Sequence, residues 1–391
     1  MWRIIAYTLL SLIFASCTSE DHAKKVLRFA HFWTEPAQQT IIDSLISQFE
    51  YSHREIVIEQ IPLQWHDGRM KLLLAHSSSQ KPDITHIGIE WAQEYISSNI
   101  FASIKVDTSS IPKEFLQTVL GNNGEVYCMP WTMNTRALVL THELAQYKDV
   151  KTWEQLLQTH VPGAIFGINA TERHSVLKKV LPILWSKGSI ICTKLPISET
   201  CDDSLIYGLE LLTQLKNRGL IEQSRILDQY LIQGTIRATL TGQWILPQLQ
   251  RIPHTIVPRI PGISGASILS GDCLGISNHT QYPQEAIAFT RYLTSYTQTK
   301  QMCLSLSDAG FPAHVNAFTD IDLVLDKDRK AYLEQCRISK ILPSPSYFLD
   351  AEEIIEDCIM QYLYGTLDAK GCRETMKRRL YSLEQAQKKG S

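Results

Sequence analysis

Residues 26–49 read VLRFAHFWTEPAQQTIIDSLISQF, which combines a short apolar strand with an amphipathic helix. After Pro36 the apolar residues return every three or four positions through Phe49, the spacing of one helical face. The same order continues with extended residues 55–61, helical residues 67–74, extended residues 82–87 and helical residues 91–97. This alternation predicts an α/β fold with a parallel sheet covered by helices, in which ligands bind at the carboxyl ends of the strands.

The remainder of the chain predicts further strands and helices. Residues 125–130 and 136–140 are extended, and they mark where the chain could pass into another domain. Residues 165–168 predict a strand, and helical patterns dominate residues 204–246. Extended residues 272–277 are followed by helices near residues 283–293, 326–338, 351–364 and 369–387.

Composition and motifs exclude several classes of protein. The 391 residues are 44% hydrophobic and 20% charged, as in a soluble globular protein of roughly two or three domains. The 38 basic and 40 acidic residues give a net charge of -2, so no field gathers nucleic-acid phosphates. The HExxH, GxSxG, Walker A and strand-linked GxGxxG motifs do not occur, and neither does CxxC. We therefore expect no catalytic residues, no cofactor, no metal site and no nucleic-acid partner.

The amino terminus indicates export and a lipid anchor. Residues 4–15 are largely apolar but fall short of the roughly 20 residues that span a bilayer. Small residues precede Cys17, and polar residues follow it, which resembles a bacterial lipoprotein signal with Phe14 as a departure from the usual aliphatic residue. We expect residues 1–16 to be the signal peptide, Cys17 to be lipidated and residues 17–24 to form a tether. An ordinary secretory signal and an unprocessed membrane anchor are the alternatives.

The cysteines need a separate explanation. Eight of the nine follow Cys17, and an exported chain meets an oxidising environment. Cys192 and Cys201 are close in sequence and flank a proline-containing loop, which makes them a candidate disulfide. The alternative is that the cysteines are buried, unreactive thiols.

Aromatic residues occupy the loops in which an α/β fold places its ligands. Trp33, Trp65 and Trp91 follow the first, second and third strands, Trp131 lies in the predicted hinge, and Trp244 ends the long helical stretch. An indole face packs against the apolar face of a sugar ring, while its N–H and nearby polar groups bind hydroxyls. The neighbouring polar candidates are Glu35, Asp83, Asn134 and Arg136. The alternatives are packing beneath loops for the tryptophans, and capping or salt-bridge roles for the polar residues.

Several motifs together resemble extracellular solute-binding proteins of the maltose-binding type. They are His31-Phe32-Trp33-Thr34, Pro82-Asp83-Ile84 with Trp91 after it, Gly124 to Trp131, Thr152-Trp153-Glu154-Gln155-Leu156, Gln233 to Trp244, Gly271 to Ile276, and Gly310-Phe311-Pro312-Ala313. Their order and spacing carry the resemblance, which covers nearly all of residues 24–388. Thr235-Ile236-Arg237-Ala238 and Thr141-His142 depart from the family's usual residues.

The resemblance implies a type II periplasmic-binding-protein fold, a Venus flytrap of two lobes, each with a mainly parallel sheet flanked by helices. Residues 25–132 and 274–318 would form the N-terminal lobe, and residues 133–273 and 319–391 the C-terminal lobe. It implies a monomeric lipoprotein in the cell envelope, on the periplasmic side or the cell surface, that captures a sugar or oligosaccharide. The expected partners are an ABC permease with its ATPase, and a membrane reached through the lipid.

Three alternatives to this function remain from the sequence. Arg69, or Arg173 and His174 near a helix start, would suit an anionic solute such as a glycerophosphate. A hydrolase on the same fold would need a close pair of acids with perturbed pKa values. A surface or scaffold lipoprotein that has lost transport would have a filled binding region.

Overall fold

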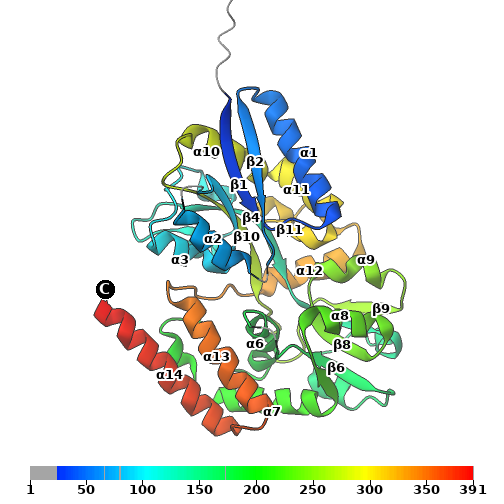
Figure 1. The fold of residues 1–391 in the computed structure, drawn as a ribbon. Coiled ribbons are helices and arrows are strands. Elements are labelled where there is room, and N and C mark those ends of the chain that lie inside the picture. The colour runs from blue at the N-terminus through cyan, green and yellow to red at the C-terminus, as the bar shows by residue number, and fades with distance from the viewer. Residues whose placement is uncertain (1–23, 66, 79–80, 172, 391) are drawn as a thin grey trace, which may run out of the picture.

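The computed structural model describes residues 24–65, 67–78, 81–171 and 173–390, which form two sheets with helices packed around each (Figure 1). The predicted signal peptide, the lipidation site Cys17 and all of the tether except Lys24 lie outside the described residues. In the described part of the chain, no helix is both long and apolar enough to cross a membrane.

The first sheet has the strand order β11-β4-β10-β3-β1-β2. Its strands are β1 (Lys25–His31), β2 (Ile56–Pro62), β3 (Ile84–Gly88), β4 (Cys128–Thr135), β10 (Leu269–Ile276) and β11 (Phe311–Pro312). The helices beside it are α1 (Pro36–Ser52), α2 (Gly68–His76), α3 (Ala92–Ser97), α4 (Lys113–Val119), α10 (Pro283–Thr294) and α11 (Tyr296–Ser305). We call this sheet with its helices lobe 1.

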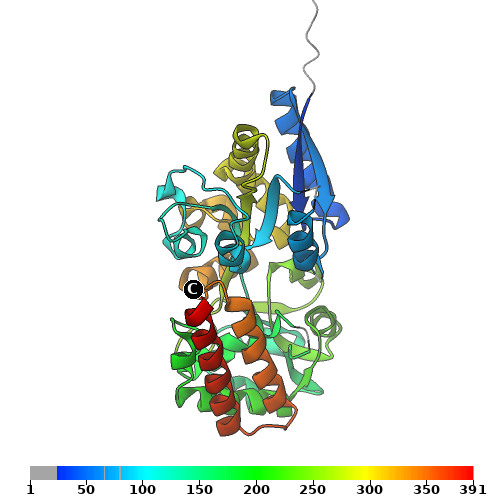
Figure 2. The same cartoon turned by 60° about the vertical axis from the view of Figure 1, so that its left-hand side comes forward.

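The second sheet has the strand order β7-β6-β8-β5-β9. Its strands are β5 (Ala137–Thr141), β6 (Ala164–Ile168), β7 (Gly219–Ile221), β8 (Ile236–Thr241) and β9 (His254–Val257). The helices beside it are α5 (Trp153–Leu157), α6 (Val176–Ser186), α7 (Ser204–Asn217), α8 (Ser224–Gln233), α9 (Leu246–Leu249), α13 (Phe348–Leu363) and α14 (Ala369–Gly390). We call this unit lobe 2, and Figure 2 shows α13 and α14 running side by side along it.

The two-lobed α/β fold predicted from the sequence is confirmed, but the sheets are mixed rather than mainly parallel. In lobe 1, β1 is parallel to β2 and β3, whereas β10 is antiparallel to both β3 and β4. In lobe 2, β6 is parallel to β7 and β8, whereas β5 is antiparallel to β8 and β9. The antiparallel pairs arise where the chain enters or returns to a lobe, because those strands are not joined by helical crossovers.

The sequence prediction that helical patterns dominate residues 204–246 misses the strands β7 and β8. Gly234 adopts a left-handed conformation with φ 76° and ends α8. The next segment, Ile236–Thr241, is buried at every position and lies between β6 and β5. Its β-branched isoleucine and threonines suit a central strand, so tertiary burial overrides the helical pattern.

Three segments of chain connect the lobes, and they are tied to each other. The chain passes from β4 to β5 through Arg136 alone, and it returns to lobe 1 just before β10. A third segment after α12 (Lys327–Ile338) runs beside the second, with Ile268 paired to Lys340. The Thr135 hydroxyl donates to the carbonyl of Ile268 at 2.8 Å and lies 2.9 Å from the Ser339 hydroxyl, so one side chain contacts all three segments.

The expected lobe boundaries at 132/133 and 273/274 fall inside β4 and β10, respectively, and the expected boundary at 318/319 falls at the end of the turn Val315–Phe318, ahead of α12. We propose that the lobes instead divide at Arg136, just before Leu269 and near Lys340. Helix α12 contacts β4 of lobe 1 and β9 of lobe 2 and lies between them (Figure 1). It belongs to neither lobe alone.

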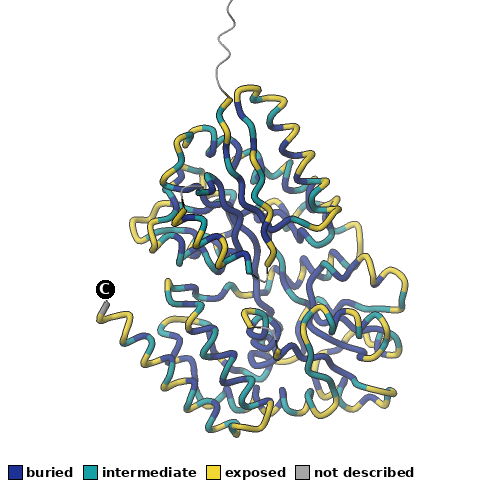
Figure 3. Tube along the Cα trace, viewed as in Figure 1, coloured by how far each residue is buried: buried dark blue, intermediate teal, exposed yellow. Residues whose placement is uncertain are grey.

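Each lobe has its own buried strands and helix faces, as Figure 3 shows. The core of lobe 2 contains both Cys192 and Cys201, each fully buried. The predicted disulfide between them is not formed, since every cysteine of the described residues is a buried free thiol. Burial raises the pKa of Cys201 to about 12, so this thiol is protonated and unreactive at neutral pH.

A substitution at Gly271 in β10 tests the pairing of β10 with β4. A Cβ atom at Gly271 would lie 2.0 Å from the carbonyl oxygen of Thr132 on the neighbouring strand β4. Because the backbone cannot yield cheaply there, Gly271→Ala should lower the free energy of unfolding by about 1–3 kcal/mol in urea denaturation. The control Gly371→Ala, near the start of α14 and facing only side chains within 4 Å, should not lower it, because alanine favours a helix over glycine by about 1 kcal/mol. Equal effects of the two variants would contradict this account.

Candidate ligand-binding site

Aromatic side chains gather at the carboxyl ends of β1, β2 and β3 in lobe 1. The aromatic cluster consists of Phe32, Trp33, Trp65, His86, Trp91 and Trp131. Trp65 stacks on Phe32 with ring centroids 4.2 Å apart and meets Trp91 at 5.7 Å. The His86 and Trp33 rings lie 5.3 and 6.0 Å from Trp131 of β4. Four of the predicted tryptophans are therefore neighbours in one cluster.

The cluster has a buried floor and an exposed edge. Trp33 and Trp131 are 5% and 1% exposed, whereas Trp65 is 49% exposed. The two buried rings also pack into the hydrophobic core of lobe 1. The sequence predicted ligand contact for all four tryptophans of the cluster. Of these, only Trp65 and the partly exposed Trp91 present ring surface to a molecule outside the core.

His86 has its proton position fixed by a backbone contact. The N–H of Phe32 donates to His86 Nδ1 at 3.2 Å, so the neutral ring carries its proton on Nε2. That nitrogen lies 3.5 Å from the Asp272 carboxylate, which in turn accepts a hydrogen bond from Thr132 at 3.0 Å. His86 is therefore a donor directed toward the strands that cross between the lobes.

A second set of side chains lies on the other side of the segments that connect the lobes. We call it the polar group, and it consists of Asn134, Arg136, Asp228, Gln243 and Trp244. The Arg136 guanidinium lies over the Trp244 ring at 5.3 Å and donates to Asn134 at 3.3 Å. Trp244 donates its indole N–H to Asp228 at 2.7 Å, and the fully buried Gln243 is next to it in the chain. Burial lowers the pKa of Arg136, and the charges of Glu90, Asp272 and Asp228 act in the opposite direction. This group thus faces the acidic residues of lobe 1.

Several of the buried polar atoms that have no hydrogen-bond partner among the described residues lie in these two groups. In the aromatic cluster they are Trp33 Nε1 and Trp131 Nε1, together with His86 Nε2, whose nearest acceptor is the Asp272 carboxylate at 3.5 Å, and in the polar group they are Arg136 Nε, Asp228 Oδ1, Gln243 Nε2 and Gln243 Oε1. Folded proteins satisfy nearly all buried polar atoms, because an unsatisfied one costs about 1–3 kcal/mol. The aromatic cluster contributes donors only, and the polar group contributes both donors and acceptors, so a polar molecule between them would find hydrogen-bond partners in both groups.

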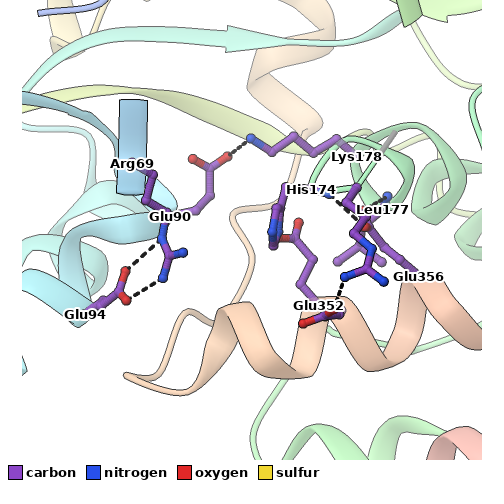
Figure 4. A network of polar contacts seen from close by, with 10 residues as sticks. Arg69, Glu90, Glu94, His174, Leu177, Lys178, Glu352 and Glu356 are labelled. Atoms are coloured by element: carbon purple, nitrogen blue, oxygen red, sulfur yellow. Dashed lines mark hydrogen bonds and ion pairs between the residues drawn. The ribbon is translucent and has the colours of Figure 1, made fainter. Parts of the chain in front are cut away.

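A charged network joins the two lobes beside the aromatic cluster (Figure 4). Lys178 of α6 pairs with Glu90, and Arg69 of α2 forms two hydrogen bonds with Glu94. In lobe 2, His174 pairs with Glu352 at 2.8 Å, and its backbone N–H donates to Glu356. The hydrogen bond that His174 donates to Glu352 raises the pKa of His174, whereas burial and the Glu352 charge raise the pKa of Glu356 to about 7.

Comparisons with known proteins place the chain in a family. The family model described as bacterial extracellular solute-binding protein matches residues 44–322, more than half of the sequence. This chain belongs to that family. It is a solute-binding protein of the extracytoplasmic compartment, and a comparison with curated protein sequences finds no match.

Solved structures of other proteins have the same fold as this solute-binding protein, although their sequence identity to it is low. A solute-binding protein of Thermotoga lettingae bound to α-D-tagatose has a TM-score of 0.79 and 17% identity, covering 91% of this chain and 99% of that chain. The GacH receptor of Streptomyces glaucescens was solved without ligand and with acarbose. It has a TM-score of 0.78 and 15% identity, covering 91% of this chain and 98% of that chain. MalX of Streptococcus pneumoniae in complex with maltopentaose has a TM-score of 0.77 and 14% identity, covering 92% of this chain and 100% of that chain.

Two predicted site residues of the solute-binding protein lie away from both groups. Glu35 is exposed at the N-cap of α1, where its backbone N–H donates to Gln38 at 3.1 Å. Asp83 precedes β3, at the opposite end of that strand from the aromatic cluster, and accepts from the Arg28 backbone and the Thr280 hydroxyl. Glu35 thus has the capping role that the sequence left as an alternative, whereas Asp83 has neither a capping nor a salt-bridge role among the described residues and ties neighbouring segments of lobe 1 together by hydrogen bonds.

Several important residues were not found from the sequence. Glu90, Asp272, Lys178, Asp228 and Gln243 come together only through the packing of separate elements. One signal was available for Glu90, because it follows the third predicted strand at its carboxyl end. Within the described residues, no group of three or more His, Cys, Asp or Glu side chains could hold a metal ion.

The two kinds of tryptophan should respond differently to truncation. Trp33→Ala removes a core ring that is 5% exposed and should lower the free energy of unfolding by about 3–5 kcal/mol. Trp65→Ala removes a half-exposed ring and the stacking on Phe32, so the loss should be about 1 kcal/mol. Urea denaturation of the two variants measures both values. A loss at Trp65 as large as that at Trp33 would show that the exposed edge is part of the core.

Proposed function

We propose that this solute-binding protein captures a sugar or oligosaccharide between its lobes and delivers it to an ABC permease and its ATPase. The observation that carries the proposal is the presence of unpartnered buried donors in the aromatic cluster and of unpartnered donors and acceptors in the polar group. A solute between them would satisfy these atoms and would stabilise closure through its contacts with both lobes.

The chemistry of the two groups favours a neutral, hydroxyl-rich ring. Trp65 and Trp91 offer exposed ring surface for the apolar face of a sugar. The indole N–H groups donate, Asp228 accepts, and Gln243 does both, which matches hydroxyls that also donate and accept. The solutes named for the similar structures, tagatose, acarbose and maltopentaose, support the same class.

An anionic solute is less well supported by the residues that suggested it. Arg69, Arg173 and His174 pair with Glu94, Glu353 and Glu352, respectively. A phosphate at these positions would have to displace a carboxylate already in contact with each cation. The sugar proposal therefore rests on atoms that lack partners, whereas the anion alternative rests on atoms that have them.

The location and attachment of the protein complete the proposal. The family is extracytoplasmic, and the sequence around Cys17 supports a lipid anchor in the cell envelope. A monomer tethered in this way would stay near its permease. The tether would join lobe 1 just before β1, which would leave lobe 2 free to move.

A thermal-shift screen tests the solute class. The mature chain from Thr18, which retains every described residue, is measured with neutral sugars, oligosaccharides, polyols, glycerophosphates, polyamines and amino acids. A ligand at 100 times its dissociation constant adds about 2.7 kcal/mol of stability. We expect a neutral sugar to raise the melting temperature and Trp65→Ala to abolish the shift. A shift from glycerophosphate alone would replace the sugar proposal with the anionic one, and no shift would favour a scaffold role.

The anchor has an independent test. Cys17→Ser removes the thiol that would carry the lipid, so the protein should move from the membrane fraction to the soluble fraction. Immunoblots of fractionated cells measure the distribution. Retention of the variant on membranes would contradict the lipid-anchor proposal.

A further inference from the structure

The ion pair between Glu90 and Lys178 links the two lobes directly at the edge of the aromatic cluster. Glu90 lies in the short turn Ile89–Trp91 directly after β3, and Lys178 lies in the first turn of α6. Lys178 Nζ is 2.8 Å from Glu90 Oε1. In Figure 4 the two side chains extend toward each other from opposite lobes and meet end to end.

The pair is buried enough for each charge to depend on the other. The side chains of Glu90 and Lys178 are 5% and 21% exposed. Burial raises the pKa of Glu90, but the charge and hydrogen bond of Lys178 and the hydrogen bond from Ser270 outweigh it, so the net pKa is lowered. The carboxylate is therefore ionised at neutral pH while Lys178 is against it. Without Lys178, a buried carboxylate loses its closest cation, which is unfavourable unless water reaches it.

The Glu90 carboxylate also borders the exposed part of the aromatic cluster. A Cβ atom at Gly88 would lie 3.1 Å from Glu90 Oε2 and 3.9 Å from atoms of both Trp65 and Trp91. The other oxygen, Oε1, already meets Lys178 and Ser270. A molecule stacked on Trp65 would therefore reach the same carboxylate that Lys178 holds.

We propose that the Glu90–Lys178 ion pair is a latch that keeps the two lobes in contact before any solute binds. Lys178 binds the Glu90 carboxylate, which a solute would otherwise contact. A solute can therefore enter only if the ion pair breaks or if Lys178 and the solute bind Glu90 together. The latch acts on the equilibrium between open and closed forms, because the contact exists only when the lobes meet. It does not depend on the chemical class of the solute.

Small-angle X-ray scattering of the solute-free chain from Thr18 tests the latch. Lys178→Met removes the ammonium group and keeps most of the side-chain length, so the radius of gyration should rise above the wild-type value. The matched control is Lys187→Met, which breaks the Lys187–Glu154 pair at 2.6 Å within lobe 2 and should leave the scattering unchanged. A Lys178→Met curve that superimposes on those of wild type and control would overturn the proposal.

A second variant separates the ion pair from effects on folding. Glu90→Gln removes the charge but keeps a side chain that can accept from Ser270, and it should also raise the radius of gyration. If both residues act through one contact, the double variant should be no more open than the more open single variant. Additive opening would show that they act separately and would contradict the latch. If circular dichroism shows that Lys178→Met is unfolded, the scattering of Glu90→Gln decides the question.

Discussion

The Thr135 hydroxyl holds together the three segments on which the two lobes depend. It contacts the carbonyl of Ile268 and the hydroxyl of Ser339, so the outgoing strand, the returning strand and the segment after α12 are fixed relative to each other. The next residue is Arg136, whose guanidinium reaches Trp244 and Asn134. The same short stretch of chain therefore joins the lobes and supplies the side chain at the centre of the polar group. In the proposed closure, one lobe would move against the other around these contacts, next to the atoms that a solute would meet.

The buried polar atoms of the site oppose stability. Unpartnered groups such as Trp131 Nε1 and Gln243 Nε2 cost free energy in the solute-free protein, and natural proteins keep such features mainly where function requires them. The surrounding structure tolerates the cost because Trp33 and Trp131 also bury large rings in the core of lobe 1. The same residues thus contribute hydrophobic stabilisation through their rings and binding capacity through their N–H groups. A latch between Glu90 and Lys178 adds a contact that favours the closed form without a solute.

Local patterns predicted the first elements well because those elements depend on local spacing. The expected strands at 55–61 and 82–87 differ by one or two residues from β2 and β3, and the helix after Pro36 is α1. Trp33, Trp65 and Trp91 follow three neighbouring strands, and for that reason the sequence grouped them before the structure did. The strand at 236–241 was missed because only burial between β6 and β5 distinguishes it from a helix. The pairing of Glu90 with Lys178 was equally out of reach, since it joins residues 88 positions apart in different lobes.

The position of β10 has a consequence for how the chain folds. This strand, Leu269–Ile276, lies between β3 and β4 in the middle of the first sheet, although it is made long after both. Lobe 1 cannot complete its sheet from the amino-terminal part of the chain alone, and β3 and β4 lack their shared neighbour until β10 arrives. Contacts so distant in sequence form slowly, because a long loop must close before they stabilise the structure. The lobe that begins first in the sequence therefore finishes folding only after most of lobe 2 has been synthesised, which leaves the amino-terminal region of this exported chain without its native sheet until then.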